Sequence, residues 1–399
     1  MGRSTGRADL PLHGGHVPAW LAARMARLGR VVVEAIVHHY GRDELLRRLA
    51  HPFWFQSFGA VMGMDWHSSG ITTSVMGALK RGLAPLEHEL GIHVCGGRGN
   101  HSRRTPSELI AIGDRTGLDG DELVRTSRLV AKVDSAAVQD GFSLYLHSFV
   151  VSDDGAWTVV QQGMNTDRGQ ARRYHWLSEG LESFVDEPHA AIAGPNQGQI
   201  ANLTDRRAAL SRSCQVKLAR VNPDRVLSTL SRLATFDQTA GKLHVRLPAR
   251  HDVRPSDVLL RRLRGTLAAA ANAGPEDFTD LLLIPGVGAR TIAALAMVSE
   301  VIHGAPYRFS DPARFSLAHG GKDGHPFPVS LTVYDETVHV LRAAVERAKL
   351  GREDKLCAIR RLDEQARVLD RSVAGPTLVQ FIEQERGRST PSASPMMYG

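Results

Sequence analysis

The sequence predicts an α+β protein, with a mixed α/β N-terminal domain that contains a β-hairpin, followed by a mainly α-helical domain. Apolar residues recur at helical spacing in the first 50 residues, whereas residues 142–162 alternate in the manner of strands. Helical spacing returns from residue 224 to residue 370. The first half is therefore expected to contain helices over about 17–50, 106–116 and 119–132 and strands over 142–151 and 156–162.

The turn between the two expected strands is a strong local signal. Asp153-Asp154-Gly155 separates them, and an Asp-Gly turn closes a β-hairpin because both residues accept a left-handed backbone. The polar stretch that follows breaks most clearly at Gly194-Pro195-Asn196-Gln197-Gly198. We expect a mixed α/β domain over 1–193, a polar, loop-rich connector over 194–223, a helical domain over 224–386 and a disordered tail over 387–399.

Composition places the chain among globular proteins. Its 399 residues, 42% of them hydrophobic, are enough for two or three domains with their own cores. The three cysteines, Cys95, Cys214 and Cys357, lie far apart, so neither a disulfide framework nor a cysteine zinc site is indicated. Because the sequence has no signal-peptide core and no apolar run of about 18 residues, it favours a cytoplasmic protein that does not enter a membrane.

The strongest motif lies at residues 281–296, Leu-Leu-Leu-Ile-Pro-Gly-Val-Gly-Ala-Arg-Thr-Ile-Ala-Ala-Leu-Ala. The motif is a helix-hairpin-helix signature. It consists of a first helix expected over about 275–283, the Pro285-Gly286-Val287-Gly288 hairpin and a second helix that opens with Arg290 and Thr291. The glycines leave no Cβ between main-chain N–H groups and a phosphate, and the second helix points its positive end at that phosphate. The motif predicts contact with a DNA backbone without base reading, against the alternative of an ordinary tight helical turn.

Part of this region resembles the helix-hairpin-helix DNA glycosylases. The resemblance is carried by Pro275-Glu276-Asp277, the hairpin, Arg290-Thr291 and Asp311 beyond the second helix. In that family the carboxylate activates a nucleophile or stabilises charge on the sugar after a base is flipped out, so the resemblance makes Asp311 the candidate catalytic carboxylate. Arg290 stands where lyase-type members carry lysine. The alternative interpretation of Asp311 is a capping or turn aspartate before Pro312.

A glycine-rich loop follows at His319-Gly320-Gly321-Lys322-Asp323-Gly324-His325. Its glycines allow the backbone to approach a ligand closely, and Lys322 is a candidate to hold a phosphate or, with a lowered pKa, to act as a nucleophile. The alternative is a flexible surface turn with solvated charges. We count Lys322 and Asp323 among the candidate catalytic residues because the loop follows the hairpin closely in the sequence.

The first domain offers a different chemistry. Asp134 and Asp140 precede the expected β-hairpin and Lys132 stands just before them, similar to the carboxylates that metal-dependent nucleases arrange around Mg²⁺, with a lysine near the attacked phosphate. The second strand ends Val159-Val160-Gln161-Gln162 and lacks the acidic-x-Lys of such a site. A Mg²⁺ site on Asp134 and Asp140 therefore competes with an interpretation of both as surface or capping aspartates.

Two further segments, 95–104 and 168–176, are expected to be basic loops. Positive charge beside aromatic rings suits phosphate contact and stacking on an unpaired base, although solvated surface charge explains each loop equally well. The net charge of +7 suits a polyanionic partner. The arginines chosen as DNA contacts are Arg103, Arg104, Arg172 and Arg173.

Segments along most of the chain resemble one family. They are Leu10-Pro11-Leu12-His13, Pro52-Phe53-Trp54-Phe55, Met64-Asp65-Trp66-His67-Ser68-Ser69-Gly70, Cys95-Gly96-Gly97, Ala131-Lys132-Val133-Asp134, Gln139-Asp140-Gly141, Val160-Gln161-Gln162-Gly163-Met164-Asn165 and His319-Gly320-Gly321-Lys322-Asp323-Gly324. On these segments, from about residue 5 to residue 350, the chain resembles the family catalogued as domain of unknown function 763. The resemblance implies no reaction, but it favours a real site among the polar residues of the first domain, such as Lys132, Asp134 and Asp140.

The leading interpretation is a DNA-processing repair enzyme. It holds the duplex backbone through the helix-hairpin-helix and removes a modified base as a DNA glycosylase, a hydrolase that needs no cofactor. One alternative is a Mg²⁺-dependent DNA nuclease with its site in the N-terminal domain, and another is a non-catalytic DNA-binding protein. A chelator separates the two enzymes, because it abolishes the nuclease and spares the glycosylase.

Overall fold

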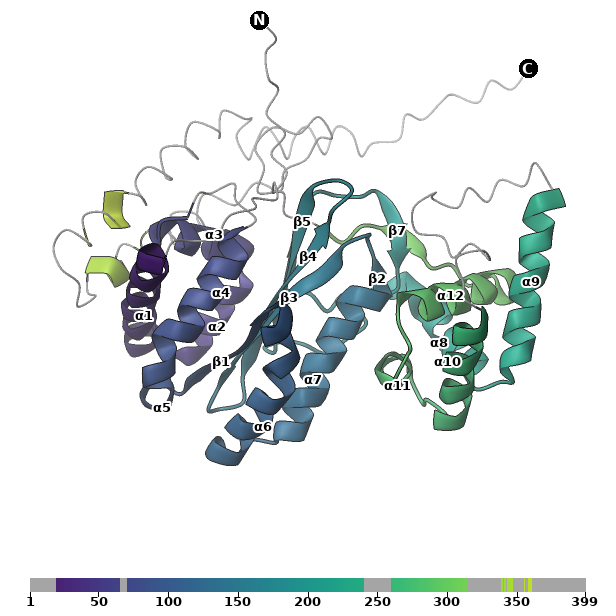
Figure 1. Ribbon diagram of the computed structural model, residues 1–399, viewed down its shortest axis with the longest axis horizontal. Coiled ribbons are helices and arrows are strands. Elements are labelled where there is room, and N and C mark those ends of the chain that lie inside the picture. Colours follow the sequence, from purple (N-terminus) through teal and green to yellow (C-terminus); the bar gives the residue numbers. More distant parts are fainter. Residues whose placement is uncertain are drawn as a thin grey trace, which may run out of the picture.

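Figure 1 shows the computed structural model of the chain, in which a central sheet lies between helices. The structure describes residues 19–64, 70–239 and 260–313, with 339, 341, 343–346, 355 and 358–360. Lys322 and Asp323, part of the segment 224–370 expected to be helical and the tail over 387–399 lie outside these residues.

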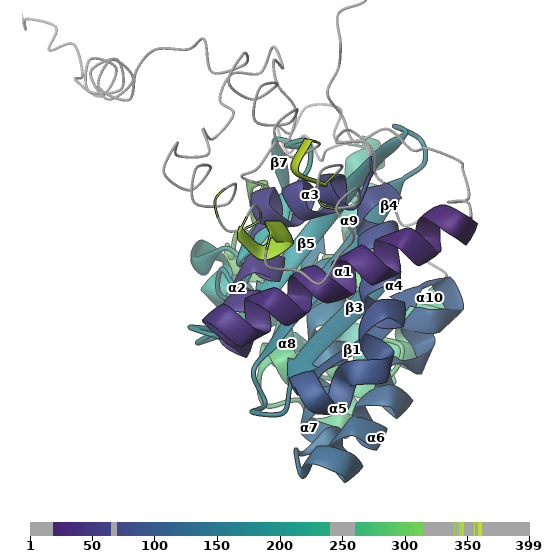
Figure 2. The same ribbon diagram turned by 90° about the vertical axis from the view of Figure 1, so that its left-hand side faces the viewer.

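The first layer consists of helices, of which the apolar spacing predicted the first two, within residues 17–50, and not those that follow. Val32 and Ile36 of α1 and Val75 and Leu79 of α4 are fully buried. Figure 2 shows α1 crossing in front of α4, with the strands behind them. The elements of this layer are α1 (Ala19–Tyr40), α2 (Arg42–Ala50), α3 (Pro52–Val61), α4 (Gly70–Leu83), the 3₁₀ turn η1 (Ala84–Leu86) and α5 (Glu87–Leu90).

Five antiparallel strands form the central sheet, in the order β1-β3-β4-β5-β6. Val150 and Val160 face the core under α1–α4, whereas Phe149 and Val159 face the core on the opposite side. Successive side chains of a strand point to opposite faces, so strands covered on both sides are buried along most of their length. The strands are β1 (Ile92–Arg98), β3 (Ser143–Ser152), β4 (Trp157–Asn165), β5 (Gln170–Leu177) and β6 (Ala191–Ala193).

The opposite face is covered by an antiparallel helix pair, α6 (Thr105–Thr116) and α7 (Gly120–Lys132). The Asp119 side chain caps α7 by accepting a hydrogen bond from Glu122 N at 3.0 Å. A Cβ at Gly113 would lie 2.8 Å from Gly120 N, so only glycine permits this close approach. The segment η2 (Gly99–Arg104) precedes α6, and a π turn, η3 (Val133–Ala137), follows α7.

A second, three-stranded sheet connects distant parts of the chain. It consists of β2 (Val138–Gln139), β7 (Gln199–Asn202) and β8 (Arg308–Ser310), in the order β2-β7-β8. Its strands therefore come from the expected first domain, the expected connector and the expected helical domain. The segment 194–223 is not merely a loop-rich connector, because it contains β7 and two consecutive helical elements over 206–219.

The helical half packs beside this second sheet (Figure 1). The hydrophobic core under α7 continues into it without a break, through Leu203, Leu267 and Leu295. Its elements are the 3₁₀ turn η4 (Arg206–Ala208), α8 (Ala209–Ala219), α9 (Pro223–Thr239), α10 (Leu260–Ala273), α11 (Phe278–Leu283) and α12 (Ala289–His303).

The α+β prediction is confirmed, as are the β3–β4 hairpin and the α6–α7 helix pair. The expectation of a basic loop over 168–176 is wrong, because most of this segment is strand β5. A strand buried on both faces lacks the alternation of apolar and polar residues that identifies strands in a sequence. Within the described residues, no helix combines the length and the apolar character needed to cross a membrane.

Candidate functional site

The predicted hairpin is a tight turn between α11 and α12. Asp277 caps α11 by accepting a hydrogen bond from Asp280 N at 2.8 Å, so this helix starts at Phe278 and not at residue 275. Val287 N donates to Ile284 O at 3.1 Å, which closes the turn. Gly286 has φ +88°, a backbone conformation that favours glycine. The local geometry is thus a helix, a glycine-dependent turn and a second helix.

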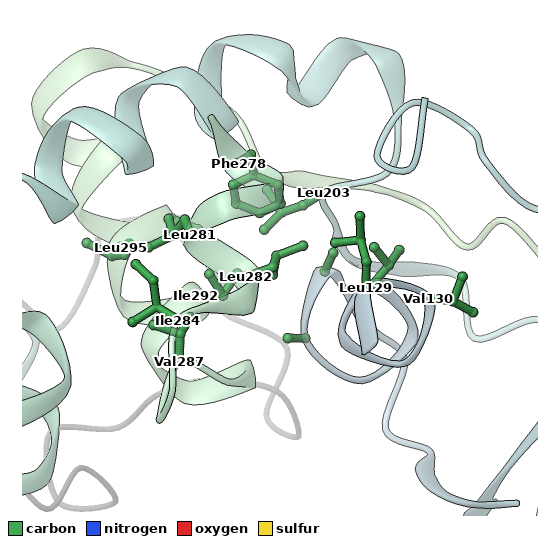
Figure 3. Packing of buried hydrophobic residues seen from close by; sticks show 14 of the residues in the cluster. Leu129, Val130, Leu203, Phe278, Leu281, Leu282, Ile284, Val287, Ile292 and Leu295 are labelled. Atoms are coloured by element: carbon green, nitrogen blue, oxygen red, sulfur yellow. The ribbon is translucent and has the colours of Figure 1, made fainter. Parts of the chain in front are cut away.

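The turn is held on α7 by apolar packing. Leu281, Leu282 and Ile284 lie in the same buried cluster as Leu129 and Val130 of α7, as Figure 3 shows. Each such side chain, when fully buried, contributes about 1.5–3 kcal/mol relative to exposure. The hairpin is therefore fixed against the N-terminal half of the molecule.

The outer side of the turn is exposed at Pro285, Gly286, Ala289 and Arg290. The Thr291 side chain is buried, so it does not act as the surface DNA contact that the motif predicted. The first N–H groups of any α-helix have no partner inside the helix, and Gly288, the residue that caps α12, has no side chain to satisfy them. The start of α12 therefore presents unsatisfied donors beside an exposed arginine.

Lys132 lies at this turn and not at a carboxylate site. Its Nζ donates a hydrogen bond to Val287 O, and Gln139 Nε2 donates to Ala289 O at 2.9 Å. Partial burial lowers the pKa of Lys132. Arg128, one helical turn before Lys132, is exposed on α7. The sequence pattern assigned Lys132 to a nuclease centre and did not indicate Arg128. The two residues are four apart on a predicted helix, and this spacing could have shown that they share one face.

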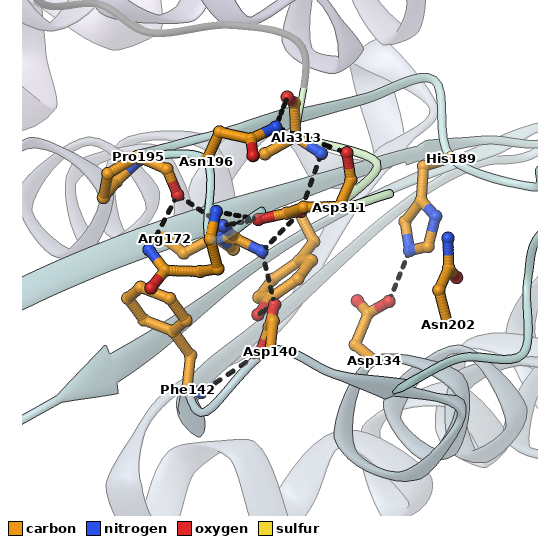
Figure 4. Close-up of polar contacts among 12 residues, drawn as sticks. Asp134, Asp140, Phe142, Arg172, His189, Pro195, Asn196, Asn202, Asp311 and Ala313 are labelled. Atoms are coloured by element: carbon orange, nitrogen blue, oxygen red, sulfur yellow. Dashed lines mark hydrogen bonds and ion pairs between the residues drawn. The ribbon is translucent and has the colours of Figure 1, made fainter. Parts of the chain in front are cut away.

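Arg172 and Asp311, predicted as separate site residues, are brought together in the interior (Figure 4). The Arg172 guanidinium donates to Asp311 Oδ2 at 2.6 Å and to Asp140 Oδ2 at 2.8 Å. Burial alone would lower the pKa of Arg172, but the charges of Asp140 and Asp311 outweigh burial and raise it. All three side chains are almost completely inaccessible. Arg172 is consequently not an exposed DNA contact.

Both oxygens of Asp311 are occupied. Oδ1 accepts from Ala313 N at 2.9 Å, and Oδ2 accepts from Gln197 N at 2.6 Å, in addition to the bonds from Arg172. Asp311 N in turn donates to Gly198 O at 2.8 Å. This arrangement matches the alternative interpretation of a turn aspartate and leaves no oxygen free to activate a nucleophile.

Arg173 points to the other face of β5 and is also buried. It donates to Gln56 Oε1 at 3.1 Å and to His175 Nε2 at 2.8 Å, and its guanidinium lies 4.5 Å from the centroid of the Phe55 ring. Burial lowers the pKa of Arg173 to about 9. The prediction that Arg172 and Arg173 form a basic surface is wrong, because β5 is covered on both faces.

Asp134 and Asp140 do not form the predicted Mg²⁺ site. Asp134 accepts from His189 Nε2 at 2.5 Å, from Trp176 Nε1 at 3.0 Å and from Gln161 Nε2. Asp140 is occupied by Arg172 and Tyr174. The part of the chain that the structure describes contains no group of three or more His, Cys, Asp or Glu that could hold a metal ion.

A buried polar chain continues from Asp134. Gln161 donates to Asp134 and accepts a hydrogen bond from His147 Nδ1 at 2.8 Å, and His147 Nε2 lies 2.8 Å from Ser127 Oγ. Since Gln161 uses its amide nitrogen on Asp134, its oxygen faces His147, and His147 carries its proton on Nδ1. Burial lowers the pKa of His147, which keeps it neutral. These side chains link α7, η3, β3 and β4 through the sheet core.

Arg103 and Arg104, in contrast, are exposed at the end of η2. The candidate site therefore consists of the hairpin surface with Lys132, Arg128 and Arg290, and of a separate basic segment around Arg103 and Arg104.

Comparison with known families matches residues 6–329 to the family described as protein of unknown function (DUF763). Because the match covers most of the chain, the chain belongs to this family. No curated protein and no solved structure matches it. The similarity to helix-hairpin-helix DNA glycosylases therefore rests on the motif alone.

Proposed function

We propose that this member of the DUF763 family binds duplex DNA through the sugar-phosphate backbone, at the hairpin between α11 and α12. One observation carries the proposal: the start of α12 is exposed, has no side-chain cap and lies beside Arg290 and Lys132. Unsatisfied N–H groups and the positive end of a 15-residue helix attract an anion.

The cations around the turn fit a phosphate chain. Arg290 is exposed on the first turn of α12, Lys132 lies against Val287 O, and Arg128 follows one turn away on α7. A phosphate bound at Gly288 N would lie within reach of Arg290 and Lys132. Phosphate contacts of this kind provide affinity without base specificity, so the expected binding is independent of sequence.

The geometry supports binding better than either reaction. Glycosylase chemistry through Asp311 requires a free carboxylate, and nuclease chemistry through Asp134 and Asp140 requires open oxygens for Mg²⁺. All three carboxylates are occupied by side chains or backbone N–H groups. Base excision thus remains a proposal that depends on Lys322 and Asp323.

The test is DNA binding by a Gly288→Ala variant, measured by fluorescence anisotropy with a labelled duplex. Gly288 has φ −154° and no atom within 4 Å of its ideal Cβ position, so alanine fits the folded chain. The added methyl would stand between the N–H groups and a phosphate. We expect about tenfold weaker binding, because a hydrogen bond to a charged group contributes about 1.5–3 kcal/mol.

Gly265→Ala is the matched control, because Gly265 in α10 also has open space at its Cβ position. This variant should bind as the wild type does. Equal affinities of Gly288→Ala and wild type, or no binding by the wild type at low salt, would overturn the proposal.

Incubation with unmodified and base-modified duplexes, with Mg²⁺ or chelator and with or without alkali, tests for a reaction. Alkali-dependent breaks at one modified base that survive chelator would establish a glycosylase. Metal-dependent breaks in unmodified DNA would establish a nuclease, and binding without breaks would support the non-catalytic function on these substrates.

A further inference from the structure

A second basic surface lies at the end of β1, far from the hairpin in the sequence. Residues 98–104, here called the basic turn, carry four basic side chains on an exposed segment. They are Arg98, His101, Arg103 and Arg104.

Internal hydrogen bonds make the basic turn a rigid structure. Ser102 Oγ donates to Gly99 O at 2.6 Å, Thr105 Oγ1 donates to Ser102 O at 2.8 Å, and Ser107 Oγ donates to Arg104 O at 2.9 Å. These bonds hold η2 and the first turn of α6 together. The four basic side chains are thus presented by an ordered backbone, which reduces the entropy lost on binding.

The base of the turn is fixed by half-buried hydrogen bonds and an ion pair. Glu108 accepts hydrogen bonds from Gly96 N at 2.7 Å and from Lys80 Nζ at 2.7 Å, and Lys80 also donates to Gly96 O at 2.9 Å. The carboxylate of Glu108 is thereby used on Lys80 and on the backbone. It does not neutralise the arginines of the turn.

The basic side chains of the turn differ in their pairing from other exposed arginines of the chain. Within the described residues, Arg98, His101, Arg103 and Arg104 form no ion pair, whereas Arg206 and Arg207 pair with Glu187 and Asp205. Arg98 lies 5.9 Å from the ring centroid of Tyr145, a half-buried residue of β3. Three exposed arginines beside an aromatic ring suit a nucleic-acid backbone.

The fold brings the basic turn toward the hairpin surface. Gly113 near the end of α6 packs on Gly120 at the start of α7, so the start of α6, next to Arg104, lies toward the other end of α7. That end carries Arg128 and Lys132. Figure 1 shows the two helices side by side below the sheet.

We infer that the basic turn is a second backbone contact, and that DNA held at the hairpin crosses the end of the α6–α7 pair that carries Arg128 and Lys132 to reach it. The inference rests on the proposed function for the first contact. It defines a footprint on the DNA, because the hairpin and the basic turn must bind the same nucleic-acid molecule.

The test compares Arg103→Ala/Arg104→Ala with Arg206→Ala/Arg207→Ala in the full chain. Both variants remove two adjacent exposed arginines and lower the net charge equally. We expect the first to bind a labelled duplex about tenfold more weakly and to reduce the slope of log K against log salt by about 2, one for each lost phosphate contact. The second should keep the wild-type slope, and unchanged thermal melting shows that both variants fold.

The outcomes separate the two proposals. If Gly288→Ala weakens binding but Arg103→Ala/Arg104→Ala does not, the footprint is wrong and the hairpin proposal stands. If Arg103→Ala/Arg104→Ala alone weakens binding, the hairpin proposal is wrong. If the Arg206→Ala/Arg207→Ala control binds DNA as weakly as Arg103→Ala/Arg104→Ala, the loss is an effect of net charge alone and the inference is wrong. The inference is also wrong if polyglutamate binds as tightly as DNA at the same salt concentration.

Discussion

Two Arg-Arg pairs of this chain have opposite environments. Arg103-Arg104 lies on an exposed turn and forms no ion pair within the described residues, and Arg172-Arg173 lies inside a strand with both faces covered. The sequence suggested the same role for both pairs. Within the second pair the two side chains point to opposite faces of the strand. Arg172 contacts two aspartates, and Arg173 contacts neutral acceptors on the other face.

The comparison shows that the neighbouring elements, and not the dipeptide, determine what an arginine does. An exposed arginine is available to an external anion. A buried one must find its partners inside the fold, since a buried charge is costly unless it is paired or fully hydrogen-bonded. Arg172 meets this requirement with charge and Arg173 with hydrogen bonds.

The largest expected effect follows replacement of Arg172. Arg172→Met leaves Asp140 and Asp311 buried without their cation, and loss of one partner of a buried pair costs about 3–5 kcal/mol. Denaturant unfolding measures the loss, with Arg104→Ala as the exposed control, expected within about 0.5 kcal/mol of wild type. If both variants were equally stable, the contrast between the two pairs would be false.

A smaller effect is expected for Arg173→Met. The substitution removes a buried cation that has no carboxylate partner in the described residues, but it also removes the hydrogen bonds that Arg173 donates to Gln56 Oε1 and His175 Nε2. Unsatisfied acceptors cost about 1–3 kcal/mol, and the removed desolvation penalty offsets part of that. The same unfolding experiment should therefore rank Arg173→Met between Arg104→Ala and Arg172→Met. A loss as large as that of Arg172→Met would reveal an anionic partner of Arg173.

The smallest effect is a pH dependence. Burial raises the pKa of Asp140, so the folded state binds the proton of this carboxyl more tightly than the unfolded state does. The contribution of Asp140 to the free energy of unfolding therefore falls as the pH rises from about 4 through the raised pKa. Asp140→Asn resembles the protonated form. Its stability relative to wild type should increase between about pH 4 and pH 7, as followed by thermal melting in buffers of equal ionic strength. A constant difference across this range would mean that Asp140 is fully charged throughout.

The sequence predicted the elements that have a clear period. The helix pair α6–α7 and the β3–β4 hairpin follow from apolar spacing and from Asp154-Gly155. It missed β5 because a strand that is buried on both faces shows no alternation, and arginines inside it looked like a basic loop. The short strands β7 and β8 are defined by partners more than 100 residues away in the sequence, and no local pattern specifies them.

The candidate site was predicted in its parts and not in its arrangement. Gly286 and Gly288 identified the turn, because a left-handed backbone and an open N–H are properties of single residues. The approach of Lys132 to Val287, like the pairing of Arg172 with Asp311, joins residues far apart in the chain. Such contacts depend on how helices and sheets pack, which one sequence does not reveal.

The hydrogen bonds between the Gly194–Gly198 loop and Asp311 have a consequence for folding during synthesis of the chain. Asp311 N donates to Gly198 O, and Gln197 N donates to the Asp311 side chain, so these bonds form only after residue 311 has left the ribosome. Until then Arg172 has one of its two carboxylates, and β7 lacks its partner β8. Folding of the first half is thus completed only when β8 and Asp311 join it. A fragment that ends before β8 should therefore be cleaved by proteases more readily than the full-length chain.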